Sequence, residues 1–273
     1  MTALPKPNKT NLARSLGICR ASLYYVSKKE DEDWQLKGRI EEILRHDHSH
    51  AYGSRRLAIE LQLNRKRVRR VMRKYGIKPR RRRGKRGRKP RELTEIHENI
   101  LLVAQPLCPH HIWTADFTEL SFHGHKIYVA TVLDLFTRLI VGLSVSIRKG
   151  APLTIQALWS ALWHYPHPEI FHSDNGKEYE AASFTGILKQ FGITISRSRP
   201  GCPWENGYQE SWYDKFQVDL GDPNRFEQLG ELVVEIYRMV WAYNHYRIHS
   251  ALKMQPAVYA EGWHQKTALT MAV

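Results

Sequence analysis

The pattern of hydrophobic and polar positions along the 273-residue chain changes near residue 93. Before this point apolar residues recur every three or four positions, as Leu36, Ile40, Ile43 and Leu44 do, which indicates amphipathic helices. After it, short apolar runs rich in β-branched residues alternate with helical stretches, which predicts an α/β layered sheet. We therefore expect an all-α region over residues 1–92 and an α/β region after it.

The α/β region has the expected order β-β-β-α-β-α-β-α, followed by a long helix and a short tail. We expect residues 93–225 to form the core and residues 226–273 to pack on it. A short helix over 94–104 is expected to precede the first strand. The expected strands are 112–121, 126–134, 138–147, 170–173 and 193–195, and the expected helices are 152–165, 179–191, 204–220 and 226–246.

Two stretches of the all-α region have the pattern of helix-turn-helix segments. In residues 8–28, Leu12, Ala13 and Leu16 fall on one helical face, and Gly17 suits the turn. A plain amphipathic helix pair would give the same pattern, so DNA contact by this first stretch is one of two interpretations.

The second candidate, at residues 54–77, is strongly basic. Asn64 can cap a helix that begins near residue 65, and Gly76 can end it. Seven cations on this helix repel one another unless phosphates neutralise them, so we interpret it as a recognition helix for the major groove in preference to a solvated basic helix. These cations are Arg65, Lys66, Arg67, Arg69, Arg70, Arg73 and Lys74.

Residues 78–92 are expected to be a basic linker that closes the DNA-binding region. Nine of the twelve residues from Arg80 to Arg91 are Lys or Arg, and none is apolar, so we expect this segment to be disordered without DNA. We interpret it as a DNA-contacting linker; a localisation signal or a passive linker are the alternatives. Its candidate contacts are Arg80, Arg81, Arg82, Arg83, Lys85 and Arg86.

The net charge of +15 is concentrated in the all-α region. Residues 1–93 hold 28 Lys and Arg against 9 Asp and Glu, whereas residues 94–273 hold 14 against 18. The basic first third of the chain can bind a polyanion, and the acidic remainder can contain a metal site made of carboxylates. No apolar run approaches the roughly 20 residues that span a bilayer. No signal peptide is apparent and the three cysteines are dispersed, so we expect a cytoplasmic protein and no membrane partner.

Three acidic residues of the α/β region are candidates for a metal site. Asp116 lies within the first expected strand, Asp174 follows the fourth, and Glu210 lies in an expected helix, with 35 residues between Asp174 and Glu210. If the two strands are neighbours, the carboxylates meet, and ionised neighbours need a cation. Two Mg²⁺ or Mn²⁺ ions about 3.5–4 Å apart would activate an attacking oxygen and stabilise a leaving oxygen at phosphorus. The alternative is that these acids are caps, surface acids or, at Asp174, part of a turn.

Polar neighbours strengthen the interpretation as a phosphate-processing site. Asn206 lies one helical turn before Glu210 and shares its face. The preceding segment carries Ser196, Arg197, Ser198 and Arg199, which can donate to phosphate, so Arg197 and Arg199 become candidate DNA contacts. No Walker-type glycine loop is present, which argues against ATP hydrolysis.

These residues resemble the transposases of insertion-sequence family three, specifically their catalytic OrfB part. The matching stretches are LGICRASLYY, YGSRRLAIEL, IWTADFTEL, TVLDLFTRLIVG, HSDNGKEY, SRPGCPWENGYQES and the closing YNHYRIHSALKMQPAVY, so the resemblance covers nearly the whole chain. It implies an RNase-H-like core, with a mixed five-stranded sheet flanked by helices, in the DDE group that includes retroviral integrases.

The resemblance also implies roles for particular residues. Asp116, Asp174 and Glu210 become a catalytic triad that binds two Mg²⁺ or Mn²⁺ ions, and Asn206 becomes an active-site helper. Arg247 and His249 fall on the closing motif, which implies contact with DNA or bracing of the site.

The sequence departs from the family pattern at two positions. Glu205 stands where the family usually has Asp, and Gln217 stands where it usually has Lys or Arg. An uncharged side chain at position 217 implies weaker or different binding of the DNA end.

The activity implied is transposition in two steps. Water cuts double-stranded DNA at an element end to free a 3′-OH, and that 3′-OH then attacks another phosphodiester, with a circular intermediate before insertion. Members act as multimers on paired ends, often with an upstream OrfA product. Two alternatives stay open: a non-catalytic DNA-binding repressor derived from a transposase, and an RNase-H-like nuclease that cuts without joining.

Overall fold

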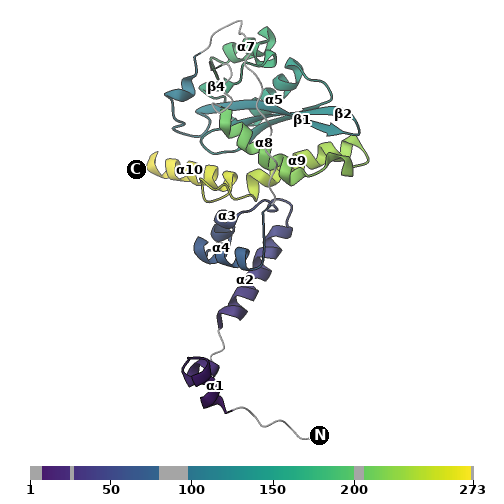
Figure 1. Cartoon of the computed structure of the whole chain (residues 1–273). Coiled ribbons are helices and arrows are strands. Elements are labelled where there is room, and N and C mark those ends of the chain that lie inside the picture. The colour runs from purple at the N-terminus through teal and green to yellow at the C-terminus, as the bar shows by residue number, and fades with distance from the viewer. Residues whose placement is uncertain (1–7, 25–27, 80–97, 200–205, 272–273) are drawn as a thin grey trace.

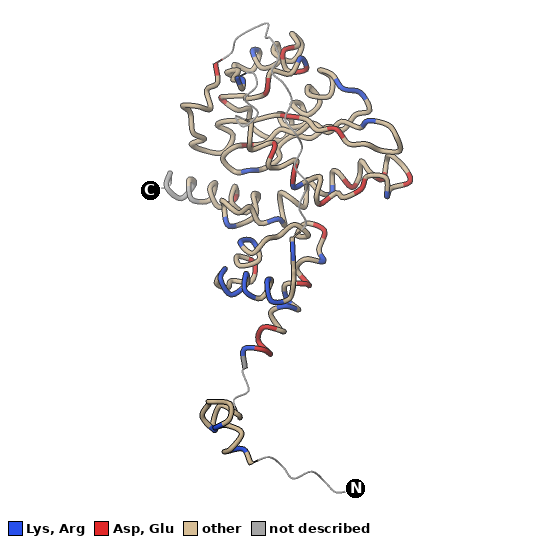
Figure 2. Tube along the Cα trace, viewed as in Figure 1, with Lys and Arg blue, Asp and Glu red and all other residues tan. Residues whose placement is uncertain are grey.

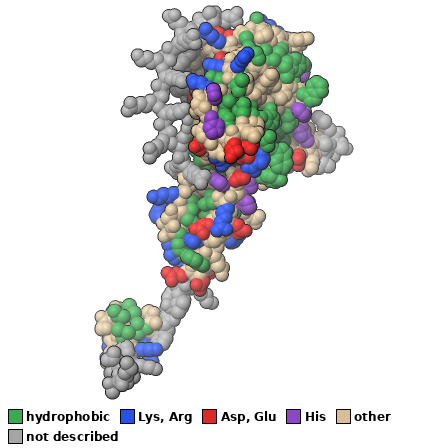
Figure 3. Space-filling model, turned by 90° about the vertical axis from the view of Figure 1, so that its right-hand side faces the viewer, with side chains coloured by type: hydrophobic (Ala, Val, Ile, Leu, Met, Phe, Trp, Pro, Cys, Tyr) green, Lys and Arg blue, Asp and Glu red, His purple; other side chains and the backbone are tan. Residues whose placement is uncertain are grey.

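The computed structural model describes residues 8–24, 28–79, 98–199 and 206–271. A layered α/β body holds the sheet, and a smaller helical unit lies against its C-terminal helices (Figure 1). The first helix, α1 (Lys9–Ser15), packs on the 3-10 turn η1 (Arg20–Tyr24), which replaces the second helix expected there. These two elements stand apart from the rest of the molecule in both Figure 1 and Figure 3.

The helical unit consists of α2 (Lys28–Arg45), α3 (Ser54–Glu60) and α4 (Arg65–Lys74). Asn64 caps α4 by accepting a hydrogen bond from the backbone N–H of Lys66 at 2.8 Å. The chain leaves α4 at Gly76, whose φ of +67° favours glycine. The expected basic helix and both of its ends are therefore confirmed. The core of the unit includes Leu36, Ile40, Leu57, Val68 and Val71.

Five strands form one mixed sheet in the order β3-β2-β1-β4-β5. The strands are β1 (Ile112–Phe122), β2 (His125–Asp134), β3 (Ile140–Ser146), β4 (Ile170–Ser173) and β5 (Thr194–Arg197). The first three pair antiparallel, while β4 pairs parallel to both β1 and β5. His123 and Gly124 turn the first hairpin, both with positive φ angles.

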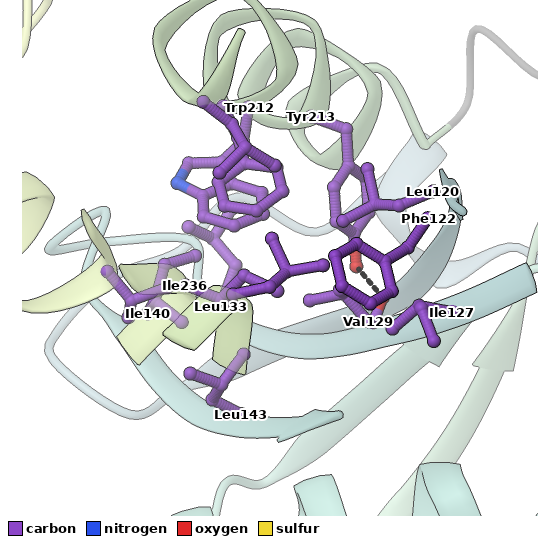
Figure 4. Packing of buried hydrophobic residues seen from close by; sticks show 14 of the residues in the cluster. Leu120, Phe122, Ile127, Val129, Leu133, Ile140, Leu143, Trp212, Tyr213 and Ile236 are labelled. Atoms are coloured by element: carbon purple, nitrogen blue, oxygen red, sulfur yellow. Dashed lines mark hydrogen bonds between the residues drawn. The ribbon is translucent and has the colours of Figure 1, made fainter. Parts of the chain in front are cut away.

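Helices cover both faces of the sheet. On one face α5 (Ala151–His164), α6 (Lys177–Glu180) and α7 (Ala182–Gln190) pack on Trp113 and Ala115 of β1. On the other face lie α8 (Gly207–Leu220) and α9 (Leu229–His245). There Trp212 and Tyr213 of α8 meet apolar side chains of the first three strands (Figure 4). The alternation of side chains along β1 thus places one set of residues in each layer.

Three expected elements differ in the structure. Within the described residues of the stretch 94–104, only the 3-10 turn η2 (Ile100–Leu102) is helical. The helix expected at 179–191 divides into α6 and α7 because Ala181 adopts a non-helical ψ of 131°. The expected short tail is instead helix α10 (Pro256–Met271), where the Trp263 ring meets Phe136 edge-on with ring centroids 4.7 Å apart. Among the described residues, none of the helices has the length and apolar character to cross a membrane.

Part of the closing motif lies inside the helical unit. Ile248 belongs to the same hydrophobic cluster as the side chains of α2, α3 and α4. Its backbone N–H donates to the Tyr52 hydroxyl at 2.8 Å, and its carbonyl accepts from Arg56 Nε at 2.9 Å. We call this region the seam, because it joins the helical unit to the α/β body through buried groups.

A buried ion pair lies beside Ile248 in the seam. Arg247 pairs with Asp219 of α8, and both side chains are only 4% exposed. Arg247 also donates to the carbonyl of His48 in the helical unit at 3.0 Å. A guanidinium held in this way braces two parts of the molecule, which favours the bracing role for Arg247 over contact with DNA.

Arg247→Ala is expected to lower the free energy of unfolding by roughly 3–5 kcal/mol, because the Asp219 carboxylate would stay buried without its partner. The matched control is Arg238→Ala. Arg238 pairs with Asp47 at 2.9 Å across the same boundary, but these side chains are 46% and 64% exposed, so the expected loss is below about 1 kcal/mol. Urea unfolding followed by tryptophan fluorescence measures both; equal losses would contradict a special role for the buried pair.

Candidate active site

The parallel pairing of β1 with β4 places two predicted carboxylates side by side. Thr114 of β1 is in register with His172 of β4, so Asp116 and Asp174 each lie two residues beyond the same paired position. Burial raises the pKa of Asp116 well above its usual value, and the nearby charges of Asp174 and Glu210 raise it further. The register therefore places Asp116 beside Asp174, and Glu210 lies near enough for its charge to act on Asp116.

Two buried side chains bind helix α8 to the sheet and so fix the position of Glu210. Gln209 Nε2 donates to the Thr114 carbonyl at 2.7 Å, and the Tyr213 hydroxyl donates to the carbonyl of Asp116 at 2.7 Å. Both side chains are buried, whereas Glu210, on the first turn of α8, faces solvent. Because these bonds fix the rotation of α8, they direct Glu210 to the open side of the site. Sequence reasoning missed both Gln209 and Tyr213.

Asn206 and Gln217 also bind β1 from α8. Asn206, the predicted helper, is buried and accepts a hydrogen bond from Thr114 Oγ1 at 2.8 Å. Gln217 donates to Thr118 Oγ1 at 2.6 Å. The Gln217 amide is thus bound to β1, and this hydrogen bond gives a structural reason for an uncharged side chain at position 217. Glu205, the other departure from the family pattern, lies outside the described residues.

Asp174 begins a tight turn that depends on glycine. The Gly176 N–H donates to Asp174 Oδ1 at 3.0 Å, and a Cβ built on Gly176 would lie 2.9 Å from the same oxygen. The Asn175 side chain donates to the Ser198 carbonyl and ties the turn to the segment after β5. Asp174 can therefore belong both to the predicted turn and to the carboxylate site, because the turn orients its carboxylate.

The polar residues of β5 and the segment after it have internal partners. His172 lies within hydrogen-bond distance of both Ser196 Oγ, at 2.9 Å, and Ser198 Oγ, at 3.0 Å. Arg197 is 2% exposed and donates to the Tyr179 carbonyl at 2.9 Å. These residues form the floor of the site, so their buried positions argue against the DNA contact predicted for Arg197. Arg199 is exposed.

Three further side chains beside Asp174 were missed from the sequence. Lys149 pairs with Glu178 at 3.2 Å. Burial raises the pKa of Asp174, Glu178 contributes to the rise, and Lys149 opposes it. Tyr179 is buried, and the charges of Asp116 and Asp174 both act on it; burial, first of all, raises its pKa well above the usual value. The motif HSDNGKEY contains Glu178 and Tyr179, but only the fold shows that these side chains and Lys149 lie around the Asp174 carboxylate.

Oxygen ligands predominate at this site, as a hard divalent cation requires. Partial burial also raises the pKa of Glu210, with a contribution from Asp214. In the part of the chain that the structure describes, no three His, Cys, Asp or Glu side chains are gathered closely enough to form a complete metal-binding group. The carboxylates are therefore arranged as an open set, with Asp116 and Asp174 adjacent and Glu210 on the solvent side.

The cations of α4 divide into two sets. Figure 2 shows Lys and Arg along this helix, and Figure 3 shows them beside acidic residues on the helical unit. One set is paired with acids of α2: Arg67 with Glu32 at 3.0 Å, and Arg70 and Lys74 with Asp33 at 2.5 and 3.4 Å. The other set faces solvent and consists of Arg65, Lys66, Arg69 and Arg73.

An open basic groove lies between the helical unit and the α/β body. Its volume is about 700 Å³. Lys215 of α8 and Ser250 contribute from the body, and burial, with Arg56 and Arg247 nearby, lowers the pKa of Lys215 to about 8. The groove therefore extends from α4 to the helix that carries Glu210. Its lining cations from the helical unit are Arg55, Arg56, Arg65, Arg69, Arg73 and Lys78.

The remaining candidate DNA contacts, His249 and the cations of the linker, lie outside the basic groove or outside the described residues. His249 is half-buried in the motif, and burial together with the neighbouring cations lowers its pKa to about 3, so its imidazole is neutral and offers no charge to phosphate. The linker residues Arg80, Arg81, Arg82, Arg83, Lys85 and Arg86 lie outside the described residues, and their contact with DNA stays a prediction.

Comparison with known proteins gives consistent matches over most of the chain. Residues 106–203 and 191–256 each match a family model described as an integrase core domain. The chain is 31% identical over 258 residues to a putative transposase, InsK, of insertion sequence element IS150 from Escherichia coli (strain K12), with 89% of each protein covered. It is 31% identical over 257 residues to an uncharacterised 31 kDa protein of insertion element IS600 from Shigella sonnei, covering 88% of this chain and 92% of that protein.

A solved structure supports the fold alone. The chain resembles a simian T-cell lymphotropic virus intasome, determined in complex with PP2A regulatory subunit B56 gamma, with a TM-score of 0.50 and 16% identity over 77% of this chain and 70% of that one. The predicted RNase-H-like core with a mixed five-stranded sheet is thereby confirmed. Because the sequence similarity to the insertion-sequence proteins spans the helical unit as well as the core, the chain belongs to the transposases of insertion-sequence family three, which are DDE polynucleotidyl transferases with an integrase core.

Proposed function

We propose that Asp116, Asp174 and Glu210 together bind two divalent ions, Mg²⁺ or Mn²⁺, and that this site cuts and joins DNA at the ends of an insertion sequence. The observation that carries the proposal is the parallel register of β1 and β4, which places Asp116 and Asp174 side by side. Burial raises the pKa of all three acids, and the charges of Asp174 and Glu210 raise that of Asp116 further. A divalent cation offsets the cost of holding these acids ionised, and the all-oxygen donor set suits Mg²⁺ and Mn²⁺.

The chain's own residues supply a rigid frame for this chemistry. When bound, the ions would lower the pKa of the attacking oxygen and stabilise charge on the leaving one. The strand β1 and the Gly176 turn hold the two aspartates, and Gln209 and Tyr213 hold Glu210 opposite them. Lys149 offers a positive charge at the rim, where a phosphate oxygen would approach Asp174.

In each of the two steps one P–O bond forms and one breaks. In the first, a water oxygen bonds to phosphorus at the element end and loses its proton, while the P–O3′ bond breaks and leaves a 3′-OH. In the second, that 3′ oxygen bonds to a new phosphorus and displaces another 3′ oxygen, which takes up a proton. One phosphodiester forms as one breaks in the joining step, so no nucleotide hydrolysis is required.

We propose that double-stranded DNA reaches the carboxylates along the basic groove. Solvent-facing cations of α4 would contact the phosphates of the terminal repeat, and Lys215 would contact the backbone where it approaches α8. We further propose that the protein pairs two element ends as a homo-oligomer in the bacterial cytosol, with an upstream OrfA product as a candidate partner.

Asp116→Asn, Asp174→Asn and Glu210→Gln are each expected to reduce cleavage and joining by at least roughly 10³-fold, because each removes a charged metal ligand. Binding to the same labelled element ends should stay within a few-fold of the wild type. The assay uses Mg²⁺ or Mn²⁺ and scores nicked and joined products separately. Nicks without joined products in the wild-type protein would indicate a nuclease, and binding without either product would indicate a repressor.

The two sets of α4 cations allow a charge-matched test of the DNA path. Replacing Arg65, Arg69 and Arg73 together by Gln is expected to weaken DNA binding and to lower the slope of log K against log salt by about one for each phosphate that is no longer neutralised. Replacing Arg67, Arg70 and Lys74 by Gln changes the net charge equally, but these cations are paired with Glu32 and Asp33, so the slope should fall less. Equal slopes for the two triple variants would argue against the groove as the DNA path.

A further inference from the structure

The hydroxyl of Tyr179 is a buried polar group that has no hydrogen-bond partner among the residues that the structure describes. The side chain is 1% exposed, and its ring packs edge-on against Phe184 with centroids 5.3 Å apart. A buried hydroxyl without a partner is destabilising relative to one that makes a hydrogen bond. Phenylalanine would make the same ring contacts without that cost, so packing alone gives no reason for tyrosine here.

Tyr179 lies next to the candidate catalytic carboxylates. A Cβ built on Gly176 would lie 2.9 Å from Asp174 Oδ1 and 3.5 Å from Tyr179 Cδ2, so the carboxylate and the ring edge border the same glycine. The charges of Asp116 and Asp174 both act on the Tyr179 hydroxyl. The backbone is fixed as well, because Arg197 donates to the Tyr179 carbonyl at 2.9 Å.

The other buried tyrosines of the described residues, Tyr213 and Tyr52, have partners for their hydroxyls. The Tyr213 hydroxyl donates to the carbonyl of Asp116 at 2.7 Å and lies 2.8 Å from Thr131 Oγ1. The Tyr52 hydroxyl accepts from the backbone N–H of Ile248 at 2.8 Å. Among the buried tyrosines of the described residues, Tyr179, which lies beside the carboxylates, is thus the one whose hydroxyl has no partner.

We propose that Tyr179 is a positioning residue for the metal site, whose hydroxyl donates a hydrogen bond to the Asp116 or Asp174 carboxylate when a divalent ion is bound. This inference rests on the proposed metal site. A metal-bound carboxylate needs a fixed orientation, and a hydrogen bond from an outer group supplies it. The hydroxyl therefore destabilises the metal-free protein and stabilises the metal-bound one.

The opposite signs of these two effects make the proposal testable with Tyr179→Phe. We expect the unfolding midpoint of the metal-free variant to equal or exceed that of the wild type. We expect its dissociation constant for Mn²⁺, measured from the free-ion EPR signal, to rise by about 10-fold or more, in the range typical when a hydrogen bond to a metal ligand is removed. Neither readout depends on DNA cleavage.

Tyr52→Phe is the matched control, since it removes a buried hydroxyl that has a partner in the seam. It should lower the metal-free unfolding midpoint and leave Mn²⁺ binding unchanged. If Tyr179→Phe behaves in the same way, its hydroxyl has a structural partner and the inference is wrong. An unchanged Mn²⁺ constant in Tyr179→Phe overturns it equally.

Asp116→Asn separates this inference from the metal site on which it rests. If Asp116→Asn abolishes Mn²⁺ binding but Tyr179→Phe leaves it intact, the metal site stands and only the role of Tyr179 falls. If the wild-type protein shows no Mn²⁺ binding that Asp116→Asn removes, both proposals fall together.

Discussion

Three carboxylates in one partly buried site repel one another, and the core must hold them together against that repulsion. The two aspartates meet because β1 and β4 run parallel with Thr114 opposite His172. Their repulsion adds to burial in raising the pKa of Asp116. Hydrophobic layers on both faces of the sheet fix the strands, so the free energy of core packing maintains an arrangement that electrostatics alone would separate.

Helix α8 connects this site to the rest of the molecule. Its first turn carries Glu210, its buried face is bonded to β1 through Gln209 and Tyr213, and its last turn carries Asp219 in the seam. One rigid element therefore spans the carboxylates, the basic groove and the boundary with the helical unit. The solvent-facing cations of α4 are consequently placed relative to Glu210 by packed side chains.

Much of the architecture could be predicted from local sequence. Asn64 and Gly76 marked the ends of α4, and the short apolar runs at β1 and β2 indicated strands, because capping and strand propensity depend on residues close in sequence. The helix α10 was missed because its apolar residues do not form a single face, so its place depends on contacts such as that of Trp263 with Phe136. The break at Ala181 likewise left no signal in the pattern.

The candidate site was predictable in part. Asp116, Asp174 and Glu210 stood out by their spacing and motifs, whereas Lys149 and Tyr179 became recognisable only beside Asp174. Arg197 was predicted as a DNA contact from its charge, and Arg247 as a DNA contact or a brace from the closing motif. Both are buried. The sequence shows that a residue is charged, but not whether its guanidinium faces water or donates to a buried carbonyl. That depends on which distant segment packs over it.

The sequence by itself determined the chemical types: a basic DNA-binding third, an acidic α/β core and three carboxylates with the spacing of a transposase. These follow from residue identity, local periodicity and motif order, which do not require long-range contacts. The tertiary structure decided which cations are free for DNA and which brace the fold, where Asp174 meets Asp116, and that a tyrosine hydroxyl lies open beside them. Those properties arise from pairing between segments far apart in the chain, because burial and electrostatic environment are set by neighbours in space.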